Sequence, residues 1–335
     1  MAIATGEILV EGYWASQERP LIPQFIPSPL TLIVVSGFLH QANLAQWIFL
    51  TAFPWGVWLP YLAGAVILAI GLITVRNEFF QERGLNKIVV LGPICLAVPL
   101  AVFGAEHFTA TTIIAGMVPA WIPGHIFWAL LVGTCLIAAA LSIAAKKYAW
   151  LASALVGVMI VLFVLLIHVP GIAANPRSPL LWVVGFRDSA FAGGAFALAS
   201  SLKEGWETQT RHRLATLARF FVAIPIAFLG VEQILHPELA PGVPLPKLTP
   251  TWVPAHSLWG YGIGAIWIVI AVFLMINKQV RPAATWLGLI TLLLVLFIYL
   301  PIVIGIPADI ANGLNYLADT LLLSGAALAL AGAYP

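Results

Sequence analysis

Carboxylate and imidazole side chains occupy spaced positions in a sequence that is otherwise strongly apolar. In the first half of the chain the candidate polar site comprises Glu106, His107, His125, His168, Arg187 and Asp188. The counterparts in the second half are Glu232, His256, Tyr299 and Asp319. Histidine titrates near neutral pH and carboxylates accept protons, so these side chains suit proton exchange with a bound ligand. Imidazole and carboxylate groups also bind divalent metals.

A packing role for the same residues is the alternative interpretation. Asp188 and Asp319 fall inside long apolar runs, where a carboxylate must face protein, find a partner or carry a proton. Either aspartate could cross-brace a helix bundle through a neighbouring Trp or His. The small residues Gly193-Gly194 and Gly325-Ala326 indicate that both segments are tightly packed. A ligand role and a packing role therefore both stay open.

Residue spacing argues against a resident metal or haem. Neither HxxxH nor ExxH spacing occurs, and the second half has Tyr299 where the first has His168. The histidines cluster toward one end of the predicted helices, whereas a bis-histidine haem needs them at facing positions within the bundle. Walker, GxSxG and GxGxxG motifs are absent. No cofactor is identified, and whether the chain is an enzyme is left open.

Membrane-spanning helices must position these residues. The chain is 61% hydrophobic and 8% charged, whereas soluble domains carry about 25% charged residues. The net charge of +2 comes without a basic block, so we expect a lipid bilayer around the protein and no nucleic acid partner. A spanning helix needs about 20 apolar residues, and helices are the expected form for such runs. Runs of this kind fall near 30–53, 57–75, 88–108, 125–145, 148–169, 180–202, 214–235, 257–276, 283–303 and 311–333.

A long internal repeat organises most of the chain. The segment from Pro119 to Trp128, PAWIPGHIFW, returns as PTWVPAHSLW from Pro250 to Trp259, 131 residues later. The same spacing relates the other counterparts listed above, except that Glu106 and Glu232 are 126 residues apart because the second half has a longer loop. We therefore predict an all-α polytopic transmembrane bundle of about ten helices. Its parts are an arm (1–29), a two-helix pair (30–84) and two parallel four-helix repeats (85–205 and 206–335).

Basic residues predict the orientation of this bundle. Ten spans place both termini on one side. The basic residues on that side are Arg19, Arg76, Arg83, Lys87, Lys146, Lys147, Lys203, Arg211, Arg213, Arg219, Lys278 and Arg281. The opposite side has only Arg177, Arg187 and Lys247. Because positive charge concentrates in cytoplasmic loops, both termini are predicted to be cytoplasmic, and the candidate site lies toward the extracytoplasmic face.

Several motifs of the first repeat resemble a known family. They are Phe103-Gly-Ala-Glu106-His107, Val118-Pro-Ala-Trp121-Ile-Pro-Gly-His125-Ile-Phe-Trp128, Leu166-Ile-His168-Val-Pro170, Arg187-Asp188 and Gly193-Gly194-Ala195. The chain resembles the DoxX-like family of bacterial integral membrane proteins over about residues 88–333. The resemblance implies a four-helix bundle in the bacterial inner membrane and, for some members, quinone-dependent oxidation of sulfur compounds. Two fused units and an extra helix pair depart from the short family form, and fold transfers within a family more safely than activity.

Three hypotheses about function follow. The leading one is a quinone-linked or redox-accessory protein, in which the outer-face residues accept protons from a quinol or a similar small amphiphile. A membrane or periplasmic protein partner is compatible with that role. The second is a small-solute or proton transporter that uses Asp188 and Asp319. The third is a non-catalytic scaffold subunit. Since the second repeat lacks counterparts of His107, His168 and Arg187, we expect any activity in the first.

Overall fold

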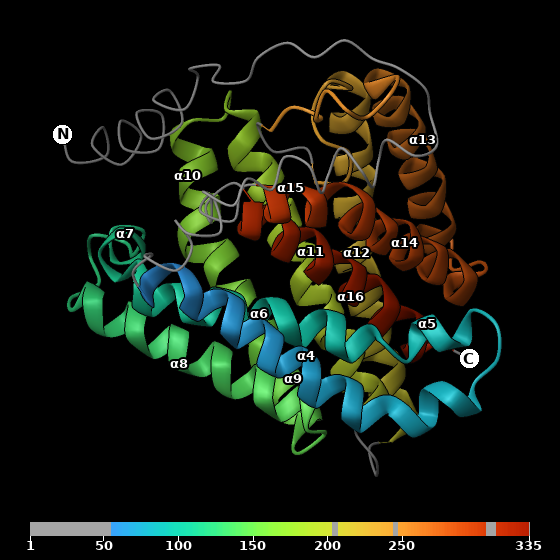
Figure 1. The fold of residues 1–335 in the computed structure, drawn as a ribbon, viewed down its shortest axis with the longest axis horizontal. Coiled ribbons are helices and arrows are strands. Elements are labelled where there is room, and N and C mark those ends of the chain that lie inside the picture. Colours follow the sequence, from blue (N-terminus) through green and yellow to red (C-terminus); the bar gives the residue numbers. More distant parts are fainter. Residues whose placement is uncertain (1–54, 203–206, 244–246, 306–312, 335) are drawn as a thin grey trace.

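The fold is entirely helical over the residues that the structure describes. This computed structural model describes residues 55–202, 207–243, 247–305 and 313–334 (Figure 1). Apart from one isolated β-bridge between Leu239 and Leu248, all regular elements in these residues are helices. Eight helical segments among them are long and apolar enough to cross a membrane. The predicted all-α polytopic bundle is confirmed, and the chain is a membrane protein.

The elements follow one another along the chain, and a long loop separates α12 from α13. The first half contains α4 (Trp55–Gln81), α5 (Asn86–Val89), α6 (Gly92–Thr109), α7 (Thr111–Ala115), α8 (His125–Ala144), α9 (Ala149–Phe163), the π-helical turn η1 (Val164–His168), α10 (Val169–Ala174) and α11 (Pro179–Leu202). The second half contains α12 (Thr208–Leu235), α13 (His256–Met275), α14 (Val280–Leu294), the π-helical turn η2 (Val295–Tyr299), α15 (Leu300–Gly305) and α16 (Asn315–Ala333).

The predicted spans agree with these helices. Each predicted span from 57–75 onward coincides with a helix or with a continuous run of helical elements. The predicted arm 1–29 and span 30–53 lie outside the described residues. Helix α11 has the length of a span but is not among the eight apolar ones, because Arg187 and Asp188 stand near its middle.

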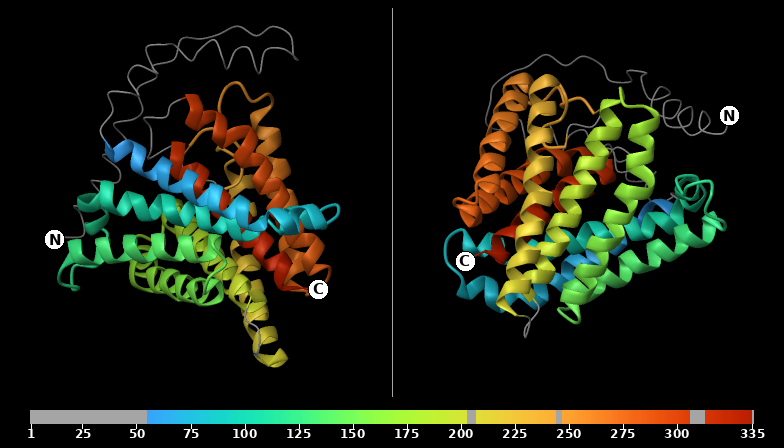
Figure 2. Two further views of the ribbon diagram at one scale, coloured as in Figure 1. Left: turned by 60° about the horizontal axis from the view of Figure 1, so that its bottom comes forward. Right: turned by 180° about the vertical axis from the view of Figure 1, so that it is seen from behind.

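Helix α16 occupies the centre of the molecule. It packs against α6, α11 and α14, and 78% of its most apolar stretch is buried. Helices α4, α6 and α8 lie side by side (Figure 1), and α11, α12 and α13 form a second group of neighbours (Figure 2, right). Since α6 and α11 touch each other little, α16 is the main link between the two groups.

Small residues set how closely these helices approach. A Cβ atom on Gly194 of α11 would collide with Ala326 of α16. The neighbouring Gly325 has no room either, because the backbone of Cys95 and Leu96 on α6 lies against it. Such close backbone contacts are how helices associate in a bilayer, where burial of apolar surface from water does not drive them together. The result is that α16 lies close to both α11 and α6 at Gly325 and Ala326.

Two π-helical turns interrupt otherwise continuous helices at matching places. In η1 and η2 the helix widens just before Pro170 and Pro301, respectively. Proline lacks an N–H and crowds the preceding turn, and a wider turn accommodates both effects. His168 and Tyr299 are the last residues of these turns. Single π-turns are frequent at functional sites, and both of these residues belong to the predicted polar set.

Candidate functional site

A buried ionic network joins α11, α16 and η1. The guanidinium of Arg187 donates through Nε to Oδ1 of Asp188 at 3.0 Å and through Nη1 to Oδ2 of Asp319 at 2.5 Å. On the other side of Asp188, His168 Nε2 lies 2.8 Å from Oδ2. The four side chains are between 8% and 16% exposed. The structure therefore brings together three residues of the first half and one of the second.

The helix geometry explains which partner each residue meets. Consecutive residues on a helix point about 100° apart, so Arg187 and Asp188 start in different directions. Asp188 faces η1, and Gly185, one turn earlier on α11, also lies beside His168. Arg187 extends toward α16 and is long enough to reach back to Asp188. Its guanidinium carbon also lies 5.6 Å from the ring centre of Phe191, one turn further along α11.

Glu106 lies close to the network through Asn315, a residue that the sequence analysis did not select. The Asn315 amide lies against both carboxylate oxygens of Glu106, and its nitrogen, when turned toward them, donates at 2.5 and 2.9 Å. Asn315 and Asp319 are four residues apart on α16 and thus share a face. Glu106, which contacts Asn315, therefore lies against the face of α16 that carries Asp319. That four-residue spacing is the signal that could have identified Asn315.

Negative charge exceeds positive charge in this cluster. Glu106, Asp188 and Asp319 contribute three carboxyl groups, while Arg187 contributes one fixed positive charge and His168 one only when protonated. Excess charge away from water is costly, so such a cluster is expected to hold at least one proton or a cation. The arrangement is therefore suited to taking up and releasing protons within the membrane.

The other predicted histidines point elsewhere. The described hydrogen bond of His107 is to its own helix, where its Nδ1 lies 2.7 Å from the carbonyl oxygen of Phe103. Its side chain packs against Gly133 of α8. His125 begins α8 and is half-buried. His256 is exposed at the start of α13 with its Nδ1 2.7 Å from the Val253 carbonyl oxygen. This local bond at the start of α13 fits the alternative in which the histidine has a packing role.

Tyr299 has a partner quite unlike that of His168. Its fully buried hydroxyl donates to the carbonyl oxygen of Pro241 at 3.1 Å. Pro241 belongs to the loop between α12 and α13, and buried Gln233 holds this loop by accepting from Gly242 N at 3.1 Å and donating to Leu239 O at 3.3 Å. The loop is the segment that is longer in the second half. Its buried Pro241–Val243 stretch occupies the interior beside Tyr299.

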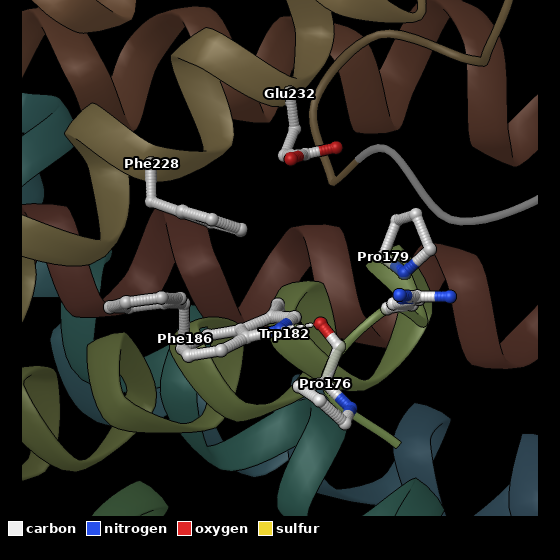
Figure 3. A pocket seen from close by; sticks show the side chains of 7 residues that line it. Pro176, Pro179, Trp182, Phe186, Phe228 and Glu232 are labelled. Carbon is white, nitrogen blue, oxygen red and sulfur yellow. Dashed lines mark hydrogen bonds between the residues drawn. The ribbon is translucent and has the colours of Figure 1, made fainter. Parts of the chain in front are cut away.

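Glu232 lines a groove between α11 and α12 rather than the network. The groove has a volume of about 430 Å³ and is lined by Pro176, Arg177, Pro179, Trp182, Phe186, Phe228 and Glu232 (Figure 3). Phe186 and Phe228 stack with ring centres 4.3 Å apart, and Trp182 continues the stack at 6.1 Å from Phe186. Trp182 and Phe186 are one helical turn apart in the sequence, which is the signal for a shared aromatic face.

Comparison with known proteins does not assign this site. No family model, no curated protein sequence and no solved structure matches the chain. Within the described residues, no group of three or more His, Cys, Asp or Glu side chains is arranged to hold a metal ion.

Proposed function

We propose that this chain is a DoxX-like protein of the bacterial inner membrane whose buried network accepts protons from a quinol or a similar small amphiphile. Both termini are cytoplasmic in this proposal, as the distribution of basic residues predicts. The network then lies in the outer part of the membrane. The eight long apolar helical segments support the membrane location.

Recurring local geometry supports the proposed division into repeats at 85–205 and 206–335. The turns η1 and η2 are separated by the same 131 residues as the sequence motifs. Gly104 and Gly133 bring α6 against α8, and Gly230 and Gly264 bring α12 against α13 in the same way. The contacts between units are reciprocal as well, since α16 packs on α6 while α11 packs on α12. Two helix units related by a twofold axis would pack in this pattern.

The excess of buried carboxyl groups is the observation that carries the proton-accepting role. Among the residues of this network, Arg187 supplies one fixed positive charge for three carboxyl groups, and protons on His168 or on a carboxyl group would balance the remainder. His168 is the most suitable point of entry, because it is partly exposed and bonded to Asp188. When a quinol is oxidised to a quinone, two protons and two electrons leave it. One hydroxyl proton would pass to this imidazole–carboxylate pair, and the second to water. Both electrons would pass to a redox-active membrane or periplasmic partner that acts as the oxidant.

Infrared difference spectroscopy on the purified full-length protein tests the proposal. Oxidising a bound short-chain quinol with ferricyanide should produce a protonated-carboxyl band that ferricyanide with the matching quinone does not produce. The band should disappear in Asp188→Asn and persist in Glu78→Gln, which removes an exposed carboxylate paired with Lys146 outside the network. Absence of bound quinone after extraction, together with unchanged thermal unfolding on adding quinone or quinol, would reject the quinone assignment.

Proton or small-solute transport is the second candidate function. It is favoured by the position of the network between α11 and α16, the last helices of the two proposed units, because transport sites commonly lie where repeats meet. Uptake by proteoliposomes that Asp188→Asn abolishes would support transport. If Glu106→Gln and Asp188→Asn only destabilise the fold and change neither quinone binding nor uptake, the network is a structural brace in a scaffold subunit.

A further inference from the structure

The groove between α11 and α12 is separate from the ionic network. Trp182 and Phe186 lie on the side of α11 that faces Phe228 of α12. On the same helix, the side chain of Arg187 points toward α16 and that of Asp188 points toward η1. A ligand in the groove would therefore lie against a different side of α11 from the network. Its binding does not depend on the proton-accepting role proposed above.

Two opposite charges flank the aromatic surface of the groove. Glu232 and Arg177 both line it, yet the described ion pairs join Glu232 to His236, at 3.8 Å, and not to Arg177. Figure 3 shows the Glu232 carboxylate pointing into the space beside Trp182 and Phe228. An acidic group, an aromatic face and a basic group thus border one small open volume.

This combination selects a ligand that carries both charges. An ammonium group is attracted to the face of an aromatic ring, most strongly to that of Trp, and to a carboxylate beside it. A guanidinium binds phosphate through charge-assisted hydrogen bonds. A neutral quinone ring would use the aromatic surface but neither charge, and an anionic group would meet the Glu232 carboxylate.

We propose that the groove binds the headgroup of a zwitterionic phospholipid, with its ammonium at Glu232 and Trp182 and its phosphate at Arg177. The groove lies where α11 begins, at Pro179, and where α12 ends, at Leu235, which is the level at which lipid headgroups meet a spanning helix. Exposed Ile224 lies one turn before Phe228 on α12 and continues the apolar surface toward the membrane interior for the acyl chains. A volume of about 430 Å³ accommodates a headgroup without the rest of the lipid.

Native mass spectrometry of the full-length protein tests this proposal. The protein is exchanged into an equimolar mixture of phosphatidylethanolamine and phosphatidylglycerol with identical acyl chains, and the lipids that remain bound are counted. We expect phosphatidylethanolamine to be retained about tenfold more strongly, the ratio that one additional charged contact provides. Glu232→Gln should abolish this preference, and Arg177→Gln should weaken retention of both lipids.

Glu238→Gln is the matched control, because Glu238 is exposed and lies 3.7 Å from the opposite nitrogen of His236. It should keep the preference for phosphatidylethanolamine. Arg177 is exposed, so we expect Arg177→Gln to fold. If Glu232→Gln does not fold, lipid retention by Arg177→Gln tests the proposal. Equal retention of the two lipids by the unaltered protein overturns the proposal. Saturation by soluble phosphoethanolamine without lipid, or displacement of the lipid by a short-chain quinone, would likewise assign the groove to another ligand.

Discussion

Arg187 of α11 binds Asp319 of α16 across 132 residues of sequence, with Nη1 and Oδ2 at 2.5 Å. The same guanidinium binds Asp188, which occupies in the first half the place that Asp319 occupies in the second. One arginine therefore serves two equivalent aspartates. A second arginine at the equivalent position is not needed, and Ala318 stands there.

Removing Arg187 should destabilise the protein strongly. Arg187→Gln leaves Asp188 and Asp319 without their shared positive charge, and breaking a buried pair in this way costs about 3–5 kcal/mol. The loss should appear as a large fall in the unfolding temperature in detergent. Arg213→Gln, at an exposed arginine, should leave that temperature almost unchanged. Equal stability of the two variants would show that Arg187 does not brace the bundle.

Enlarging Gly194 should separate α11 from α16. Gly194→Ala places a methyl group against Ala326, and overpacking of this kind costs about 1–3 kcal/mol. Gly262→Ala is the control, because a Cβ on Gly262 of α13 meets no atom within 4 Å. The unfolding temperature of Gly194→Ala should be lower than that of the unaltered protein. The unfolding temperature of Gly262→Ala should be equal or slightly higher, because Ala favours the helix more than Gly does.

Asn315 and Glu106 should be energetically coupled. Asn315→Ala removes hydrogen bonds to a carboxylate, which are worth about 1.5–3 kcal/mol. Once Glu106→Gln has been introduced, the same change should cost less, because the charge that Asn315 supports is gone. A double-mutant cycle on the free energy of unfolding measures the difference. Strict additivity of the two changes would mean that the pair does not interact.

The bond from Tyr299 to Pro241 should hold the longer loop inside the second half. Tyr299→Phe removes a buried hydroxyl and leaves the Pro241 carbonyl without this donor, at a cost of about 1–3 kcal/mol. Limited proteolysis should then cut the loop between α12 and α13 faster. The exposed Tyr261 offers the control, and Tyr261→Phe should leave the cleavage rate as it was.

Much of the helical architecture follows directly from the sequence. Long apolar runs must become helices in a bilayer, because each backbone polar group needs a partner within its own segment. The apolar run 125–145, for example, is helix α8. Pro123 and Gly124 precede its first residue, and Lys146 and Lys147 follow its end. The charged pair in α11 was also predictable as buried and partnered, because an exposed carboxylate at that depth would be costly.

The partners within the site were much harder to predict. Helical periodicity predicts that the side chains of Arg187 and Asp188 point about 100° apart. It does not predict that the long arginine side chain turns back to bond Asp188. His107 and His125 stood among the same motifs as Glu106, yet the fold turns His107 to its own backbone. Asn315 had no motif of its own, and its importance comes only from the carboxylate opposite.

By itself, the sequence determined the membrane environment, the helices and the polar positions that recur along the chain, since these depend on local composition and on spacing along one helix. Only the tertiary structure decided that Asp319 reaches Arg187, that Tyr299 bonds the inserted loop and that Glu232 lines an aromatic groove. The reason is that such contacts depend on how helices cross. Here the crossing is set by close approaches such as that of Gly194 to Ala326, which join residues far apart in the chain.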